Sequence, residues 1–196
     1  MSEPHPREAA PPGLLLVQEF VNSVELPDGA DELGTPREAA AWLSRHGVRA
    51  GRLREEDRGR LIEAREALRA VLAGHTGCNV DAASCVRLQD LLGRAPLRAV
   101  VSPQGAMLVC DASGVDAFLG RISAAIALAS QEAWERLKVC RSDACRWAFY
   151  DHSKNGRGAW CSMRVCGSRE KARAYRERKR QVGAGRPVDP AAEVLG

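Results

Sequence analysis

The sequence predicts a mainly α-helical protein with one small β-hairpin, ending in a cysteine-rich module and a basic helix. Three observations carry this prediction. Apolar residues recur at intervals of three and four through most of residues 14–138, as in helices that bury one face. Four cysteines then fall within 27 residues, and a run rich in Lys and Arg follows the last of them. With 196 residues, 45% of them apolar, the chain can form one ordinary core and a small appended module.

The chain divides into four predicted segments. Residues 1–13 hold four prolines and little to bury, so we predict a flexible arm there. Residues 14–138 form the helical domain, residues 139–182 the cysteine module with its helix, and residues 183–196 a flexible tail. No apolar run reaches the roughly 18 residues of a membrane span, and the N-terminus lacks the pattern of a signal peptide. We therefore expect a soluble, cytoplasmic protein without a membrane partner.

Five helices are predicted in the helical domain. The first begins at Leu14 and is ended by the Pro27–Gly29 break. The second begins at Thr35, where Thr35-Pro36-Arg37-Glu38 has the form of a capping box, and ends at Gly47. The other three are expected over residues 54–72, 81–92 and 115–138, and the last of these leads directly to the first cysteine of the module.

One β-hairpin is predicted within this domain. Its strands cover residues 97–102 and 106–110, and Pro103-Gln104-Gly105 supplies the turn. It is the only clear β signal before the cysteine module. The hairpin and the helices around it are candidates for a ligand pocket or for a homodimer face. Three scattered cysteines are expected to be small buried apolar groups rather than a redox sensor: Cys78, Cys85 and Cys110.

The spacing of the other four cysteines predicts a structural zinc site. Cys140-x4-Cys145 and Cys161-x4-Cys166 are separated by fifteen residues, and each pair can supply two sulfurs from one turn. Four thiolates close the coordination shell, so we expect one structural Zn²⁺ and no catalytic metal. The alternatives are buried or redox-active cysteine pairs and an iron–sulfur cluster. His152 lies between the pairs and is expected to be an ordinary loop residue.

Aromatic residues lie between the two cysteine pairs. Residues 147–150 and 159–160 are predicted to form a small hairpin around the Asn155-Gly156 turn. We expect the aromatic rings to pack on the metal site, and stacking on nucleic-acid bases is the alternative. Turn, hairpin and helix together predict a fold similar to a treble clef.

The charge distribution sets the end of the chain apart. Residues 140–182 carry 12 basic and 4 acidic side chains, whereas residues 1–139 carry 16 basic and 19 acidic ones. In a helix, Arg169, Arg173, Arg176 and Arg180 share one face, and Lys171, Arg178 and Lys179 extend the basic surface. We predict that these seven side chains bind nucleic acid, with a merely solvated charged face as the alternative. The sequence leaves DNA and RNA open.

Two stretches resemble known bacterial families. Residues 136–180 resemble the CGNR-type zinc finger in cysteine spacing, in the step Trp160-Cys-Ser-Met163 and in the basic helix. One departure is Ser168, where the family has asparagine. The helical domain is similar to the stress-associated ABATE domain that precedes this finger, chiefly through LVQEFVNSVEL at Leu16–Leu26. The resemblance implies a nucleoid-associated transcription regulator whose first domain senses a ligand or stress and whose finger binds DNA.

Two other classes of protein are alternatives to a DNA-binding regulator. The first is a zinc-stabilised module for protein or RNA contacts without sequence-specific DNA binding. The second is an enzyme. The sequence shows no paired catalytic carboxylates, no nucleophile motif and no phosphate-binding loop, so we expect no enzymatic activity.

Overall fold

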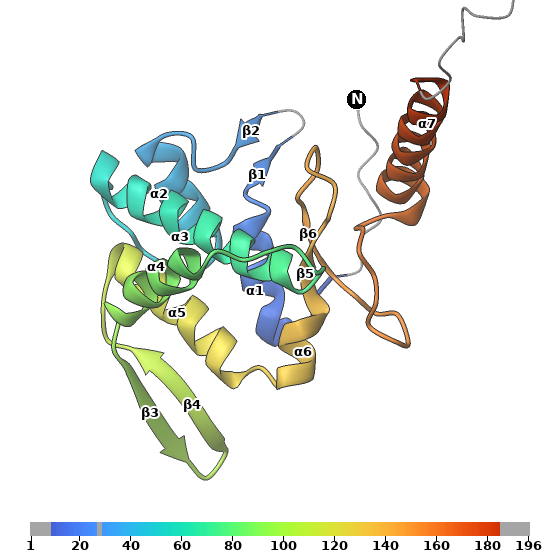
Figure 1. Ribbon diagram of the computed structural model, residues 1–196. Helices are drawn as coiled ribbons and strands as arrows, with labels where there is room; N and C mark the ends of the chain where they lie inside the picture. Colours follow the sequence, from blue (N-terminus) through green and yellow to red (C-terminus); the bar gives the residue numbers. More distant parts are fainter. Residues whose placement is uncertain (1–8, 27–28, 185–196) are drawn as a thin grey trace, which may run out of the picture.

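The computed structural model describes residues 9–26 and 29–184 (Figure 1). Most of the predicted arm (residues 1–8) and most of the predicted tail (residues 185–196) lie outside the described residues. The end of the arm belongs to the body instead. Ala10 is buried and its backbone N–H donates to Gln18 Oε1 at 2.7 Å, and the first helix already begins at Pro12.

Each of the five helices predicted in the body has a counterpart in the structure, and they confirm the mainly α class. They are α1 (Pro12–Val21), α2 (Pro36–Arg45), α3 (Glu55–Gly74), α4 (Ala82–Gly93) and α5 (Gly114–Leu128). Thr35 caps α2, since its hydroxyl oxygen accepts a hydrogen bond from the backbone N–H of Glu38 at 3.2 Å. Gly47, with a φ of 74°, ends this segment in the left-handed conformation that favours glycine.

The core lies where α1, α2, α3 and α5 meet. Three fully buried rings, Phe20, Trp42 and Phe118, contact one another edge to face or tilted, with centroid separations of 4.8 to 5.8 Å. Leucines of α3 complete the same cluster, because Leu61, Leu68 and Leu72 fall on one stripe of the helix. Within the described residues, no helix combines the length and the apolar character that crossing a membrane requires.

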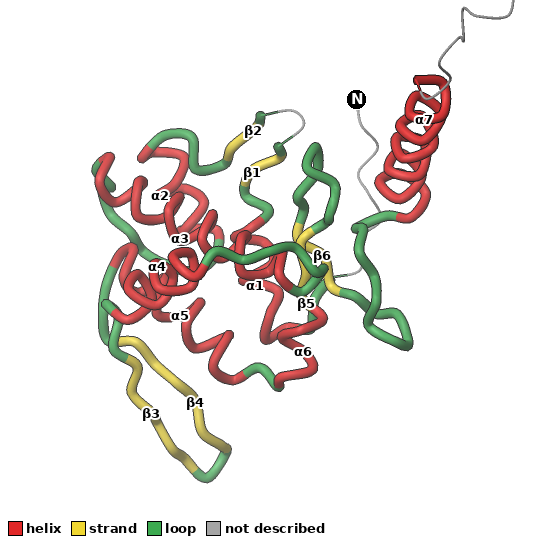
Figure 2. Tube along the Cα trace, viewed as in Figure 1, coloured by secondary structure: helices red, strands yellow, loops and turns green. Residues whose placement is uncertain are grey.

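The predicted hairpin is present as β3 (Leu97–Ser102) and β4 (Gly105–Cys110), paired antiparallel and joined by Pro103 and Gln104. It projects away from the helices (Figures 1 and 2). A second, unpredicted ribbon joins β1 (Val24–Glu25) to β2 (Ala30–Asp31). Two-residue strands are too short to show a period in the sequence. This ribbon is tied down by Asp31, whose carboxylate accepts two hydrogen bonds from the buried Arg65 guanidinium, at 2.7 and 2.9 Å.

The prediction of one long helix over residues 115–138 is wrong for the second half of that range. After α5 ends at Leu128, Ser130 starts a new short helix, α6 (Gln131–Arg136), by accepting a hydrogen bond from the Ala133 N–H. The chain then becomes a strand, β5 (Leu137–Val139), in which all three residues are buried. The apolar spacing continues across the break, so periodicity alone could not locate it.

The predicted hairpin between residues 147–150 and 159–160 is also wrong. Residues 148–150 do form a strand, β6 (Ala148–Tyr150), but it pairs antiparallel with β5. Residues 159–160 are not a strand, and the Ala159 carbonyl accepts a hydrogen bond from the Arg141 N–H at 2.9 Å. Because β5 and β6 pair, the predicted domain boundary after residue 138 runs through a shared two-stranded sheet.

Candidate metal centre and basic helix

The first cysteine pair lies on a tight turn. The Cys145 N–H donates to the Ser142 carbonyl at 2.9 Å, and the Cys140 N–H donates to the Trp147 carbonyl at 2.8 Å. Arg146 has a φ of 47°, the only positive value among the described non-glycine residues. The turn therefore directs both thiols to one point.

The second pair lies where a single π-helical turn leads into the last helix. This turn, η1 (Met163–Gly167), is capped by Ser162, whose hydroxyl accepts a hydrogen bond from the Val165 N–H at 3.3 Å. Gly167 lies close to the Met163 side chain, since an added Cβ would lie 2.9 Å from Met163 Sδ. Helix α7 (Ser168–Ala184) follows without interruption.

The four sulfurs form one compact cluster. All four ligand atoms lie within 4.8 Å of one another, and three of the cysteines, Cys140, Cys145 and Cys166, are buried. The Sγ atoms of Cys145 and Cys161 are 3.6 Å apart, and those of Cys161 and Cys166 are 3.8 Å apart. A disulfide would need about 2.05 Å. A tetrahedron with Zn–S bonds of about 2.3 Å has edges of about 3.8 Å, so the donor set fits one zinc ion.

The four thiols, lying so close together, strongly affect one another's ionisation. Hydrogen bonds from the Cys140 and Cys161 thiols lower the pKa of Cys145 to about 2. Burial and the neighbouring thiolates raise the pKa of Cys166 to about 12, and hydrogen bonds with Cys140 and Cys145 together with burial raise the pKa of Cys161 well above its usual range. A divalent cation offsets this mutual repulsion, because it binds thiolates and supplies the missing positive charge.

The aromatic residues divide between the metal cluster and the body. Trp147 and Trp160 pack against the cysteines, as predicted. Ala148 and Tyr150 of β6 pack on the core of the body instead. His152 is not part of the sulfur cluster, and its Nε2 lies 3.2 Å from the Ala9 carbonyl oxygen. Ser168 does not cap α7 but donates a hydrogen bond from its hydroxyl to the Met163 carbonyl at 3.2 Å.

A buried ion pair, which no pattern in the sequence predicts, joins β5 to the loop between the cysteine pairs. Lys138 Nζ donates to Asp151 Oδ2 at 2.9 Å, and the two side chains are only 4% and 5% exposed. Lys138 also donates to the Gly156 carbonyl at 2.5 Å, while Asp151 accepts from the Ser153 and Gly158 N–H groups. Burial opposes the charge, but these hydrogen bonds lower the pKa of Asp151 to about 2. The pair fixes the loop that joins the two halves of the metal site.

The body and the finger are joined by further buried contacts. The Arg69 guanidinium of α3 donates to the Arg146 carbonyl at 2.7 Å and to the Val21 carbonyl at 2.5 Å. The Asn22 side chain makes two hydrogen bonds with the Ala148 backbone, at 2.7 and 2.9 Å. The finger is therefore anchored to the ends of α1 and α3.

Helix α7 stands clear of the body (Figure 1), and its first turn is tied to the first cysteine turn by the Ser142 hydroxyl, which donates to Glu170 Oε1 at 3.3 Å. All seven predicted nucleic-acid-binding side chains are exposed: Arg169, Lys171, Arg173, Arg176, Arg178, Lys179 and Arg180. Of these, only Arg173 forms ion pairs within the described residues, with Glu170 at 2.6 Å and Glu177 at 3.8 Å. Tyr175 is 61% exposed, so it does not face inward.

The basic side chains of α7 do not all lie on one face of the helix. At about 100° per residue, Arg169, Arg173, Arg176 and Arg180 fall within an arc of about 60°, as predicted. Lys171 and Arg178 lie roughly opposite this arc. The helix therefore carries cations on two opposite sides.

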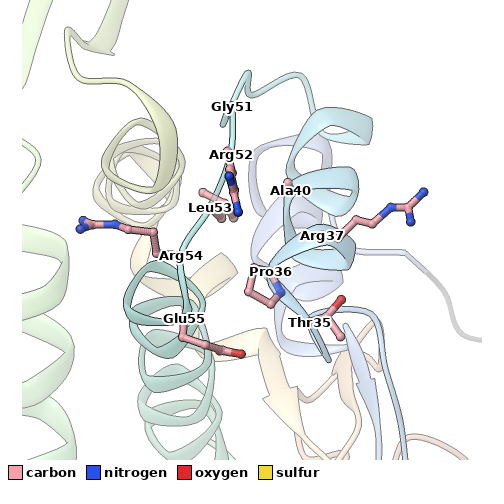
Figure 3. Close-up of a pocket in the computed structure, with 9 residues that line it drawn as sticks. All are labelled: Thr35, Pro36, Arg37, Ala40, Gly51, Arg52, Leu53, Arg54 and Glu55. Atoms are coloured by element: carbon pink, nitrogen blue, oxygen red, sulfur yellow. The ribbon is translucent and has the colours of Figure 1, made fainter.

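The body also carries solvent-open hollows. One lies between α2 and the start of α3 and is lined by Thr35, Pro36, Leu53 and three arginines (Figure 3). Arg37 and Arg54 point outward to opposite sides, and Arg52 lies between them. Arg54 forms ion pairs with Glu56 and Asp57. The hollow therefore has no set of convergent polar groups that would define a ligand.

The architecture defines a class: a helical domain fused to a four-cysteine zinc finger that ends in a basic helix. The chain belongs to the ABATE family, described as "putative stress-induced transcription regulator", whose model matches residues 15–137. The CGNR zinc finger model matches residues 136–179, so the four cysteines are those of a zinc finger that holds one structural zinc ion. Among curated proteins, none matches the chain.

Proposed function

We propose that this zinc-binding protein of a regulator family binds duplex DNA through α7. The observation that carries the proposal is the pair of opposite cationic sides on an exposed helix that the zinc site holds away from the body. The major groove of B-DNA is about 12 Å wide and has a phosphate backbone along each wall. A helix inserted there needs cations on both sides, which α7 has.

The arginines of α7 do not contribute equally to this proposal. Arg173 already has two carboxylate partners, Glu170 and Glu177, so it has less to gain from a phosphate. Arg169, Arg176 and Arg180 occupy the same face without an ion pair among the described residues. We assign the principal phosphate contacts of this face to these three side chains.

The test measures binding of the zinc-loaded full chain to duplex DNA across a salt series. Replacing Arg169, Arg176 and Arg180 by alanine should weaken binding and reduce the slope of log K against log salt by about 2.7, at 0.9 per phosphate contact. The matched control replaces three exposed arginines of the body, Arg37, Arg49 and Arg52, and should leave the slope unchanged. An equal loss in both variants would contradict the assignment to α7.

The alternative is a zinc-stabilised module for RNA or protein contacts. Measuring duplex DNA, hairpin RNA and single strands at one salt concentration separates the two. Tighter binding of hairpin RNA than of duplex DNA would favour the alternative. In the proposal the body acts as the sensor of ligand or stress, on the strength of the family to which residues 15–137 belong, and no enzymatic step is assigned to it.

A further inference from the structure

The β3–β4 ribbon has an unusual surface for a projecting element. From Ala99 to Cys110 it carries no charged side chain, although 28% of the whole chain is charged. The pairing register places six apolar side chains on one face: Leu97, Ala99, Val101, Ala106, Leu108 and Cys110. This face is therefore apolar from end to end.

Only one end of this face is covered by the body. Cys110 lies against α5, where its Sγ would be 2.6 Å from a Cβ added to Gly120. At the other end Val101 is 78% exposed, and on the opposite face of the ribbon Met107 is 60% exposed. The distal half of the ribbon thus leaves apolar surface in water.

The ribbon has no other support in its distal half. Within the described residues its sheet has two strands only, so both edges are unpaired. An isolated two-stranded ribbon is marginally stable in water, and open apolar edges invite pairing with another chain. A surface that covers the apolar face of the distal half would stabilise the ribbon and shield Val101 from water.

We propose that a second copy of this chain covers it, with the two ribbons packed face to face across a twofold axis. The matching surface must be apolar and uncharged. On the described surface of this chain, the other large exposed apolar side chains lie singly on separate segments: Leu26, Val86, Leu128, Met163 and Tyr175. The apolar face of the ribbon is therefore the surface that best complements the same face of a second copy. In an isologous contact the two uncharged faces meet without like-charge repulsion.

The one charged residue of the two strands does not oppose this contact. Arg98 lies near the base of the ribbon, and its guanidinium donates two hydrogen bonds to the Asp111 carboxylate, at 3.0 and 3.2 Å. Two ribbons of this length make a small interface, and interfaces of this kind dissociate on dilution. The dimer should therefore form reversibly with concentration.

The test is the mass of the zinc-loaded full chain by sedimentation equilibrium over a wide concentration series, without DNA. The mass should rise from 21.2 kDa towards twice that value. Val101→Lys should raise the dimer dissociation constant more than about tenfold, because the contact would bury a lysine without a counter-ion. The matched control is Val86→Lys on α4, where the side chain is 56% exposed, and this variant should dimerise like the parent chain.

Three outcomes would overturn the proposal: a parent chain that stays monomeric throughout the series, a Val101→Lys variant that dimerises as well as the parent, or a Val86→Lys variant that loses the dimer too. Far-ultraviolet circular dichroism and zinc content check that the variants are folded. The result is independent of whether α7 binds DNA.

Discussion

At the scale of single residues, the Lys138–Asp151 pair is a buried contact that holds the loop of the finger in place. A buried charge without a partner is costly, often by 3–5 kcal/mol when one member of a pair is removed. Here each member also holds the loop backbone, through the Gly156 carbonyl and the Ser153 and Gly158 N–H groups. The pair thereby sets the path of the chain from the first cysteine pair to the second.

Asp151→Asn should lower the free energy of unfolding by about 3 kcal/mol, since Lys138 would be left buried without its counter-ion. It should also change the response to acid. The folded-state pKa of Asp151, about 2, lies below the usual aspartate value of 3.8, so its contribution to stability is present above about pH 4 and is lost as the pH falls towards 2. Urea unfolding between pH 2 and 7 measures both effects.

The control for this prediction is Asp143→Asn, because Asp143 is 91% exposed and lies 3.9 Å from Arg146. Exposed pairs of this kind contribute at most about 1 kcal/mol. If Asp143→Asn proved as destabilising as Asp151→Asn, the special role of the buried pair would be refuted.

At the scale of elements, the break at Ser130 decides how the finger is built. Had the helix continued to residue 138, Leu137 and Val139 would point to different sides of a helix and β6 would have no partner. Because α5 ends at Leu128 and the short α6, which starts after the Ser130 cap, ends at Arg136, residues 137–139 are extended and pair with β6. The strand β5, which pairs with β6 of the finger, thus lies almost entirely in the segment that the sequence assigns to the body.

Because β5 is shared, we expect that a fragment beginning after residue 138 does not form a complete finger. A fragment of residues 139–184 lacks most of β5 and the lysine that neutralises Asp151. A fragment of residues 130–184 keeps both. Zinc titration should show weaker binding by the shorter fragment, by tenfold or more for a loss of about 1.4 kcal/mol. Equal zinc affinity of the two fragments would contradict the shared strand.

At the scale of the whole molecule, body and finger share one core. Leu137, Val139 and Ala148 belong to the same buried cluster as the helices of the body. Arg69 and Asn22 add hydrogen bonds from the ends of α3 and α1 to the finger backbone. A change at the metal site is therefore expected to reach the body.

Removal of zinc by a chelator should lower the melting temperature of the body as well as unfold the finger. It should also speed amide exchange at the C-terminal end of α1, beside Asn22. The variant Cys161→Ser should reproduce both effects, whereas Cys78→Ser, which alters a cysteine outside the tetrad, should not. A body that melts at the same temperature with and without zinc would show that the two parts are not coupled.

Part of the fold can be predicted from short-range patterns in the sequence. The helix cap at Thr35, the apolar stripes of α3 and α5, the turn at Pro103 and the spacing of the four cysteines each act within a few residues of chain, and each is confirmed in the structure. The shared face of Arg169, Arg173, Arg176 and Arg180 on α7 follows in the same way from helical geometry. Their contact with nucleic acid stays a prediction.

By itself, then, the sequence determined the helical class, the hairpin and the metal tetrad, because periodicity, caps and paired cysteines are short-range features. Only the tertiary structure decided that Leu137–Val139 is a strand, that Lys138 and Asp151 form a buried pair and that the finger is anchored to the body. Asn22 and Ala148 are 126 positions apart, and no local pattern records a contact over that distance. Burial in a common core overrides local preference at these sites, and that burial exists only once the chain has folded.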